Sequence, residues 1–328
     1  MLRTAPPKLS RIQDPISQRL DRVVDEFRRI VAADFDRVAE INDYLLQVRG
    51  KLFRPSLLLL CSEVGDRSRP EAESLAAVVE LIHLSTLVHD DAVDHSVLRR
   101  GMPTVNAMWS HQVAIIMGDY LYSRSISELA RLGDIEPVRI LAAAANAMSV
   151  GELRQLASCD ALGFSERDYY LLIECKTASL ISAACGLGAL YGATEFQEQL
   201  SRFGHDLGMA FQIVDDLLDY TSDEAAMGKP VGLDLREHKV TLPLLHVLPR
   251  LSDAERANVE EFFAKPEPEE AEIAAVVGLV REYGGLDYAK SQALAFAQRA
   301  RESLNGLPPG PALQALHESI AYVVERRR

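Results

Sequence analysis

Basic residues are scarce relative to acidic ones in this 328-residue chain, which has 35 lysines and arginines, 48 aspartates and glutamates, and a formal net charge of −13. A nucleic-acid-binding protein normally presents a basic face. The balance therefore argues against nucleic acid as a partner. The surplus carboxylates are instead available as ligands for cations.

Cysteine is also rare. The four cysteines are Cys61, Cys159, Cys175 and Cys185, and no two of them have the CxxC spacing. All but Cys159 lie in apolar stretches. We therefore expect reduced, buried thiols in a cytoplasmic protein.

Long apolar runs and strand patterns are missing as well. The first 15 residues contain no apolar core of signal-peptide length, and no run approaches the roughly 18 apolar residues of a membrane span. No segment alternates convincingly between apolar and polar residues, and no Asn-Gly hairpin signal separates two such segments. The sequence therefore predicts a soluble protein without a substantial sheet.

Apolar residues instead recur at three- and four-residue steps, which is the period of an amphipathic helix. The stretches with this pattern are 16–47, 71–98, 111–132, 136–157, 166–191, 196–221, 253–264, 270–283 and 286–304. No long linker separates them, because 265–272 has the composition of a surface turn and 305–312 that of a loop. We predict an all-α protein with one large domain, 1–328, of roughly ten or more helices, in which residues 1–30 form a peripheral segment.

The stretch "LVHDDAVDHSVLRRG" (87–101) places three aspartates on one face of a predicted helix. At 100° per residue, Asp94 lies about 40° and Asp91 about 100° from Asp90. A following glycine and proline predict that the helix ends near residues 98–100. A solvated acidic face is the simplest interpretation of one DDxxD motif. The residues before it are apolar, however, and the motif occurs twice.

The second copy begins about 125 residues later, where Asp215, Asp216 and Asp219 repeat the spacing. Gln212 lies about 60° from Asp215 on the same helix. If the two acidic faces meet, six carboxylates surround one cavity and repel one another. Aspartate oxygens suit hard cations, and Mg²⁺ commonly shares its coordination with substrate phosphates. The two motifs therefore predict a phosphate-bearing substrate bound through Mg²⁺.

Basic side chains that can bind the phosphates accompany both motifs. They are Lys51, Arg54, Lys176, Lys229 and Lys239. Lys176 stands in the middle of a largely apolar helical stretch and is followed by Thr177. The Gly- and Pro-rich segment 227–243 follows the second motif, and such a loop can close over a site as a lid. The alternatives are a surface position for Lys51 and Arg54 and snorkelling at a helix end for Lys176.

Six stretches together resemble a known family. They are "GKLFRP", "ELIHLSTLVHDDAVDHSVLRRGMPTVN", "GDYLYSRS", "KTASLISAACGLGA", "FQIVDDLLDYTSDEAAMGKPVGLDLREHKVTLPLLH" and "YVVERRR". In this order they are similar to the motifs of the trans-isoprenyl diphosphate synthases, also called polyprenyl synthetases, from about residue 45 to the end. The resemblance implies a large all-α, single-domain bundle of the isoprenoid synthase type with a central cavity.

The resemblance also implies roles for the matching residues. The residues implied to bind three Mg²⁺ ions on an allylic diphosphate are Asp90, Asp91, Asp94, Asp215 and Asp219, with Asp216 in support. Those implied to contact the same diphosphate are Arg99, Lys176, Lys229 and Lys239. Those implied to hold isopentenyl diphosphate without metal are Lys51, Arg54, His83 and Arg100. Thr177 and Gln212 are implied to steady the carbocation or the leaving group.

The implied reaction is head-to-tail chain elongation. The metals and bases withdraw the allylic diphosphate, the double bond of isopentenyl diphosphate attacks the resulting carbocation, and a proton is lost to the departing diphosphate. The protein then contributes electrostatic stabilisation and orientation rather than a nucleophile.

Product length is predicted from the residues one turn before the first motif. In the family, bulky aromatic residues there close the pocket, whereas this chain has Ser85 and Thr86. We therefore expect a long all-trans product of seven to ten isoprene units, as in the quinone side-chain synthases. Met117, Tyr120 or Leu121 further down could instead close the pocket and give a geranylgeranyl or farnesyl product.

Three other functions are alternatives. A terpene cyclase would need neither two complete DDxxD motifs nor a second diphosphate site, a non-catalytic subunit of a heteromeric synthase tends to lose the aspartates, and a metal-binding scaffold would show no turnover. The family usually forms homodimers, and helix 111–132 could supply the interface. We expect at most peripheral membrane contact, for product release. We expect Arg326–Arg328 to form a frayed tail rather than to approach the diphosphates.

Overall fold

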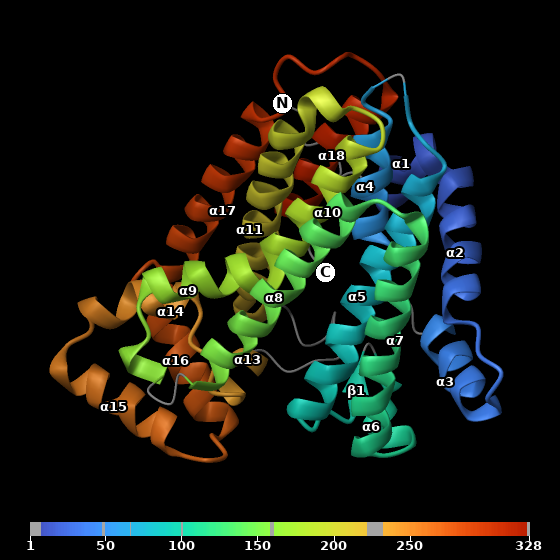
Figure 1. Ribbon diagram of the computed structural model, residues 1–328. Helices are drawn as coiled ribbons and strands as arrows, with labels where there is room; N and C mark the ends of the chain where they lie inside the picture. The colour runs from blue at the N-terminus through green and yellow to red at the C-terminus, as the bar shows by residue number, and fades with distance from the viewer. Residues whose placement is uncertain are drawn as a thin grey trace.

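The computed structural model describes residues 8–47, 50–65, 67–99, 101–157, 161–221 and 232–326. Within these ranges the chain is almost wholly helical (Figure 1), which confirms the all-α prediction. The described residues nevertheless include one small antiparallel hairpin of β1 (Leu98–Arg99) and β2 (Met102–Pro103). Each strand has two residues, so the described part of the chain has no substantial sheet, as expected.

Long helices form the body of the bundle. They include α4 (Phe53–Ser62), α5 (Glu71–Val93), α7 (His111–Leu132), α8 (Ile135–Ala157), α10 (Ser179–Leu190) and α11 (Gln197–Thr221). Helix α5 packs against α7, α4 and α2, and most of its residues are buried. It ends at Val93, earlier than the predicted 98–100, because His95 adopts a left-handed backbone with φ of 52° and the chain turns into β1.

Local capping explains several helix boundaries. The side chain of Ser110 accepts a hydrogen bond from the backbone N–H of Val113 at 3.2 Å and begins α7, while Gly133 in the left-handed region ends it. A capping box of Ser165 and Asp168 begins α9 (Glu166–Ile173). These signals fix boundaries that apolar periodicity alone leaves open.

The predicted helix 166–191 is interrupted. A π-helix, Glu174–Ala178, separates α9 from α10. Two glycines allow neighbouring helices to approach it. A Cβ atom on Gly151 of α8 would lie 2.8 Å from Cys175 Cβ, and one on Gly208 of α11 would lie 2.6 Å from Ala178 Cα. Lys176 is therefore held in a widened turn between two close neighbours, and such turns frequently occur at functional sites.

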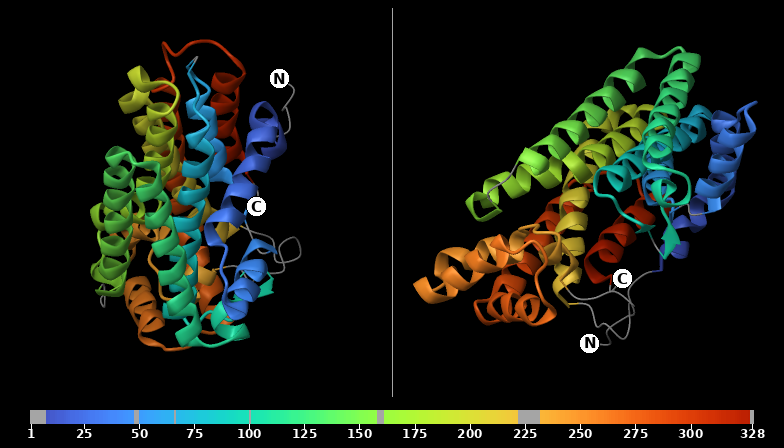
Figure 2. Two further views of the ribbon diagram at one scale, coloured as in Figure 1. Left: turned by 45° about the vertical axis from the view of Figure 1, so that its right-hand side comes forward. Right: turned by 90° about the horizontal axis from the view of Figure 1, so that it is seen from below.

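The predicted helix 16–47 is also divided, into α2 (Ser17–Val31) and α3 (Asp36–Gln47), after a short α1 (Leu9–Gln13). Figures 1 and 2 show α2 and α3 at one edge of the molecule. Their apolar side chains are nevertheless buried in the main core cluster.

The remaining helices pack around this body in different places (Figures 1 and 2). They are α6 (Val105–Met108), α13 (Leu233–Arg236), α14 (Leu242–Val247), α15 (Asp253–Ala264), α16 (Glu270–Glu282), α17 (Gly285–Glu302) and α18 (Pro311–Glu325). Buried apolar side chains form two clusters, and α11 and α17 contribute to both. The two clusters are therefore joined by continuous helices.

Two helical stretches, Glu71–Val93 and Glu166–Leu190, are long and apolar enough to cross a membrane by length and composition. This corrects the expectation that no stretch approaches that length. Within the structure, 67% and 61% of their apolar windows are buried, as in the core helices of a bundle.

Candidate active site

A cavity of about 640 Å³ collects side chains from both aspartate motifs. The predicted site residues that line it are Asp94, Lys176, Thr177, Gln212, Asp216 and Lys239. They come from the end of α5, the π-helix, α11 and the segment after α13. The two motifs, which are far apart in the sequence, therefore face a shared cavity.

Asp90 of the first motif is partly buried at the end of α5. Burial, and then the charge of Glu152, raise its pKa to about 6, although Lys176 opposes the shift. A cation close to Asp90 would favour its ionised form. The third motif residue, Asp94, caps α5 and is exposed toward the cavity.

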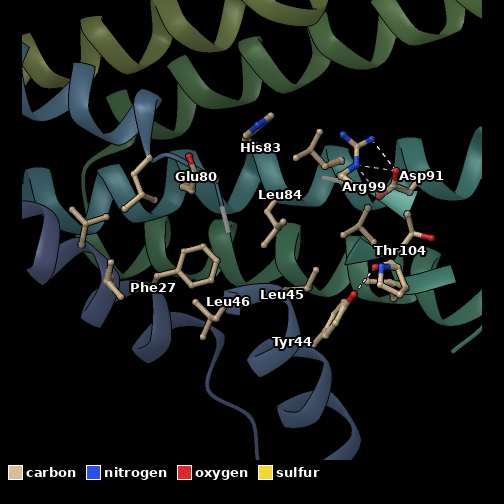
Figure 3. Close-up of a pocket in the computed structure, with 18 residues that line it drawn as sticks. Phe27, Tyr44, Leu45, Leu46, Glu80, His83, Leu84, Asp91, Arg99 and Thr104 are labelled. Atoms are coloured by element: carbon tan, nitrogen blue, oxygen red, sulfur yellow. Dashed lines mark hydrogen bonds and ion pairs between the residues drawn. The ribbon is translucent and has the colours of Figure 1, made fainter. Parts of the chain in front are cut away.

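Asp91 has a different environment. It is buried, and Nε of Arg99 donates to both of its carboxylate oxygens at 2.9 Å. This pair borders a second, apolar cavity of about 50 Å³ between α5 and helices α2 and α3. Figure 3 shows the apolar and aromatic side chains that fill the walls of this cavity, among them Phe27, Tyr44, Leu45, Leu46 and Leu84. Arg99, predicted to contact the allylic diphosphate, is therefore paired here with an aspartate that is predicted to bind metal.

Lys176 projects from the π-helix toward α8. Its Nζ donates to Gln155 Oε1 at 2.8 Å and forms an ion pair with Glu152. The same Glu152 influences Asp90 electrostatically. Lys176 therefore lies beside the first motif, where its ammonium group can leave Glu152 and pair with a bound anion instead.

A hydrogen-bonded chain fixes the centre of the second motif. Thr177 Oγ1 donates to Gln212 Oε1 at 2.8 Å, and Gln212 Nε2 donates to Asp216 Oδ1 at 2.8 Å. The hydroxyl of Tyr169 donates to the other oxygen of Asp216 at 2.6 Å. Burial raises the pKa of Asp216 to about 7, and the charges of the neighbouring motif aspartates add to the shift. Asp216 is thus anchored by the protein, with both oxygens already engaged.

Asp219 links the second motif to the segment that follows it. Its carboxylate accepts the backbone N–H groups of Leu233 and Asp234 at 3.1 Å each. Burial raises the pKa of Asp219, and burial together with Asp216 and Asp219 raises that of Asp234 to about 8. Burial lowers the pKa of Lys239, but Glu237, Asp234 and Asp94 outweigh it and the pKa is raised. Lys239 is therefore a charged group between the two motifs.

Asp215 is paired with the C-terminal segment. Arg326 donates from Nη2 to Asp215 Oδ1 at 2.9 Å and to the backbone oxygen of Phe211 at 2.9 Å. The expectation of a frayed tail is therefore wrong for Arg326, which folds back onto the second motif.

The segment predicted to hold a metal-free diphosphate lies next to the second motif. Lys51 precedes α4, and Leu52 has a left-handed backbone with φ of 52°. The ring of Phe53 stacks on that of Phe211 with 5.9 Å between centroids. This contact brings the start of α4, which includes Arg54, alongside α11 one turn before Asp215. His83 lies on α5, which packs on α4, whereas Arg100 and Lys229 lie outside the described residues.

The carboxylates of both motifs suit a hard divalent cation. Burial and mutual repulsion raise the pKa of several of them, and a cation would relieve that repulsion. Among the described residues, however, no three acidic, His or Cys side chains already form a metal site. A cation here therefore needs further ligands from water or substrate, as Mg²⁺ in phosphate-binding sites does.

Comparison with known proteins identifies the family and confirms the fold. The family model described as polyprenyl synthetase matches residues 35–280. The chain belongs to the polyprenyl synthetase family. The synthase is 37% identical to "Heptaprenyl diphosphate synthase component 2" of Geobacillus stearothermophilus over 321 residues, which are 97% of this chain and 99% of the relative.

Solved structures agree with this placement. A decaprenyl diphosphate synthase from Rhodobacter capsulatus has a TM-score of 0.92 and 34% identity, and the match covers 98% of the synthase and 100% of that chain. A polyprenyl synthase from Caulobacter crescentus, complexed with calcium and isoprenyl diphosphate, has a TM-score of 0.92 and 30% identity over 99% of the synthase and 100% of that chain. The predicted family, fold and enzyme class are confirmed, and the synthase is a prenyltransferase that acts on isoprenyl diphosphates.

The synthase also carries site residues that the sequence analysis missed. They are Glu152, Gln155, Tyr169 and Asp234. Glu152 and Gln155 are three residues apart on α8, a spacing that puts them on one face. Asp234 precedes Lys239 by five residues in a segment already predicted as a lid. Tyr169 had no signal, because its partner Asp216 is distant in sequence.

The predicted chain-length residues differ in environment. Ser85 is buried, and its hydroxyl donates to the backbone oxygen of Gly118 on α7 at 2.9 Å. A Cβ on Gly118 would lie 2.2 Å from His89 Nε2, so α5 and α7 approach closely here. Thr86 is only partly buried. The small size of Ser85 is therefore used in helix packing, whereas Thr86 is the residue whose size can affect the adjoining space.

The rival pocket-closing residues lie in or beside the main core. Met117 and Leu121 are buried, and the hydroxyl of Tyr120 donates to the backbone oxygen of Val31 on α2 at 3.0 Å.

Proposed function

We propose that the synthase condenses isopentenyl diphosphate head to tail with an allylic diphosphate and makes a long-chain all-trans polyprenyl diphosphate. The observation that carries the proposal is the meeting of two aspartate motifs, Lys176 and Lys239 around one cavity. A cyclase that acts on one diphosphate would not need a second set of basic side chains. Here Lys51 and Arg54, at the start of α4 beside α11, are the candidates for that second set. The names of the similar heptaprenyl and decaprenyl enzymes support a long product.

The carboxylates would hold Mg²⁺ on the leaving diphosphate. The candidates are Asp90, Asp91, Asp94, Asp215 and Asp219, and of these Asp91 is already paired with Arg99. When bound, the cations supply positive charge where the departing diphosphate develops negative charge. Lys176 and Lys239, which both line the cavity, would stabilise the same charge.

Fixed dipoles orient the reacting groups. Thr177, Gln212 and Asp216 form one hydrogen-bonded chain along the cavity wall, so their positions are set before substrate arrives. Lys51 and Arg54 would supply positive donors, and His83 a ring nitrogen, for a diphosphate that binds without metal. Arg100 is assigned to the metal-free isopentenyl diphosphate, and Lys229 to the allylic diphosphate, on sequence alone.

We further propose that the synthase is a single-domain cytoplasmic homodimer that uses about three Mg²⁺ ions with substrate bound. Ile115 and Ile116 on α7 are 42% and 64% exposed, which supports an interface on the predicted helix. A heteromeric assembly is the alternative, since the relative from Geobacillus stearothermophilus is named as a component 2. All six motif aspartates are present in this chain, which favours a catalytic subunit.

Product sizing tests the proposal. Purified protein is incubated with farnesyl diphosphate, isopentenyl diphosphate and Mg²⁺, and the extracted products are separated by length. Products of seven to ten isoprene units are expected. Accumulation at twenty carbons would instead support the geranylgeranyl alternative. The mass of the purified protein in solution tests its assembly: twice the mass of the chain would support the homodimer, and a monomeric mass would support the heteromeric alternative.

A further inference from the structure

The last described residue of the chain, Arg326, forms an ion pair with the second aspartate motif. Arg326 follows α18, and its side chain is only 9% exposed, although it lies next to the chain end. It donates to Asp215 Oδ1 and to the backbone oxygen of Phe211. Asp215 is 57% exposed, so the arginine is the buried member of the pair.

Aromatic packing holds the guanidinium in place. It lies 3.9 Å from the centroid of the Phe211 ring, a distance at which a cation is attracted to the ring face. Phe211 stacks on Phe53, and Phe53 packs against Tyr322 of α18 with 5.7 Å between centroids. The contact therefore follows from the docking of α18 on α4 and α11.

The arrangement leaves the arginine incompletely satisfied. Its Nε is buried and has no hydrogen-bond partner. A buried donor without a partner is destabilising. The pair with Asp215 is thus a contact that an alternative arrangement can replace.

The charges make the arginine and a divalent cation competitors at Asp215. Arginine remains protonated at any pH at which the protein functions. A dication on the same carboxylate would meet a positive guanidinium within hydrogen-bond distance, and the two repel. The carboxylate oxygens of Asp216 do not relieve this repulsion, because both already accept hydrogen bonds.

We infer that Arg326 is the counter-ion of Asp215 in the cation-free protein and competes with the divalent cation for this carboxylate, so that it sets the cation affinity of the second motif. The inference rests on the proposed function in one respect, the binding of a divalent cation at Asp215. Arg326 is in this sense a positioning residue, because it acts through Asp215.

Cation binding to the substrate-free protein tests the inference without measuring turnover. Mn²⁺ is titrated and the free ion is followed by electron paramagnetic resonance. Arg326→Gln removes the charge and is expected to tighten binding by about 2- to 5-fold, the range of a partly exposed ion pair. Arg299→Gln is the matched control, since Arg299 also lies over a phenylalanine ring, at 3.8 Å, and pairs with Asp206 at 3.4 Å.

The outcomes separate the two proposals. Binding that is equal or weaker in Arg326→Gln than in the unaltered protein overturns the competition but leaves the cation site intact. Absence of binding in both proteins overturns the cation site at Asp215 and the competition with it. In an Asp215→Asn background, Arg326→Gln is expected to have no effect, and a persisting effect would overturn the inference.

A measurement on the unaltered protein guards against misfolding of the variant. Hydrogen exchange is followed by mass spectrometry with and without saturating Mg²⁺. Release of Arg326 from Asp215 is expected to speed exchange near the end of α18, around Tyr322. Unchanged or slower exchange there would contradict the competition.

Discussion

Arg99 donates to both carboxylate oxygens of Asp91 at 2.9 Å and ties the β1–β2 hairpin to the end of α5. The neighbouring Asp94, three residues later, is exposed and lines the large cavity. Two aspartates of one motif therefore have different environments, one paired within the protein and one open to the site.

Asp91→Asn is expected to lower the free energy of unfolding by about 1–3 kcal/mol, because it removes a buried partner of a charged hydrogen-bond donor. Asp94→Asn, at an exposed position, is expected to change it by less than about 0.5 kcal/mol. Urea denaturation without Mg²⁺ measures both variants. Equal losses would contradict the structural role of Asp91.

Stability without divalent cations is expected to fall as pH rises from about 4 to about 8. Burial raises the pKa of Asp216 to about 7 and that of Asp234 to about 8, whereas an unfolded aspartate titrates near 3.9. Between these values the folded protein binds more protons than the unfolded chain, so deprotonation favours unfolding.

Denaturation at a series of pH values with EDTA, and again with Mg²⁺, measures this effect. Mg²⁺ is expected to restore stability mainly at the alkaline end, where the carboxylates are ionised. Asp216→Asn is expected to flatten the profile. A cation-free protein that gains stability between pH 5 and 8 would contradict the assignment.

Glu152→Gln is expected to lower the pKa of Asp90 below its present value of about 6, because the charge of Glu152 is one of the causes of the raised value. The pH midpoint for Mn²⁺ binding to the substrate-free protein should then shift downward by about half a unit or more. Glu174→Gln is the control, since Glu174 lies in the same π-helix as Lys176 but pairs with His205. A shift of equal size in both variants would contradict a specific effect of Glu152 on Asp90.

Thr86→Phe is expected to shorten the main product, because Thr86 is partly exposed and lies about 40° from Asp90 on α5. Ser85→Phe is expected to destabilise the protein by about 1–3 kcal/mol instead, since Ser85 is wedged against Gly118. Product sizing and thermal unfolding measure the pair. An unchanged product from a folded Thr86→Phe variant would show that another residue limits growth.

Much of the fold could be predicted because apolar periodicity records which helix face is buried. Helix 111–132 was predicted with its observed bounds, and its capping residues explain why. The π-helix around Lys176 could not be predicted, since it results from close packing at Gly151 and Gly208 on other helices.

The site shows the same division. The carboxylates could be found because their spacing repeats, and Lys176 because a charge is unusual in an apolar helix. Their partners could not be assigned from one sequence, because Arg99–Asp91 and Arg326–Asp215 depend on where a hairpin and the last helix fold back. Asp234 could be recognised as a site residue only from the folded structure, which brings it close to Asp216 and Asp219.

The central claim is that both aspartate motifs act on one departing diphosphate. Diphosphate release is measured with farnesyl diphosphate and Mg²⁺, with and without isopentenyl diphosphate, for the unaltered protein, Asp90→Ala, Asp215→Ala and the control Asp206→Ala, which removes an aspartate of α11 outside the motif. We predict that diphosphate release depends on isopentenyl diphosphate. It is expected to fall by about 100-fold or more in each motif variant and to persist in the control. Near-normal release by either motif variant, or release without isopentenyl diphosphate, would contradict the account.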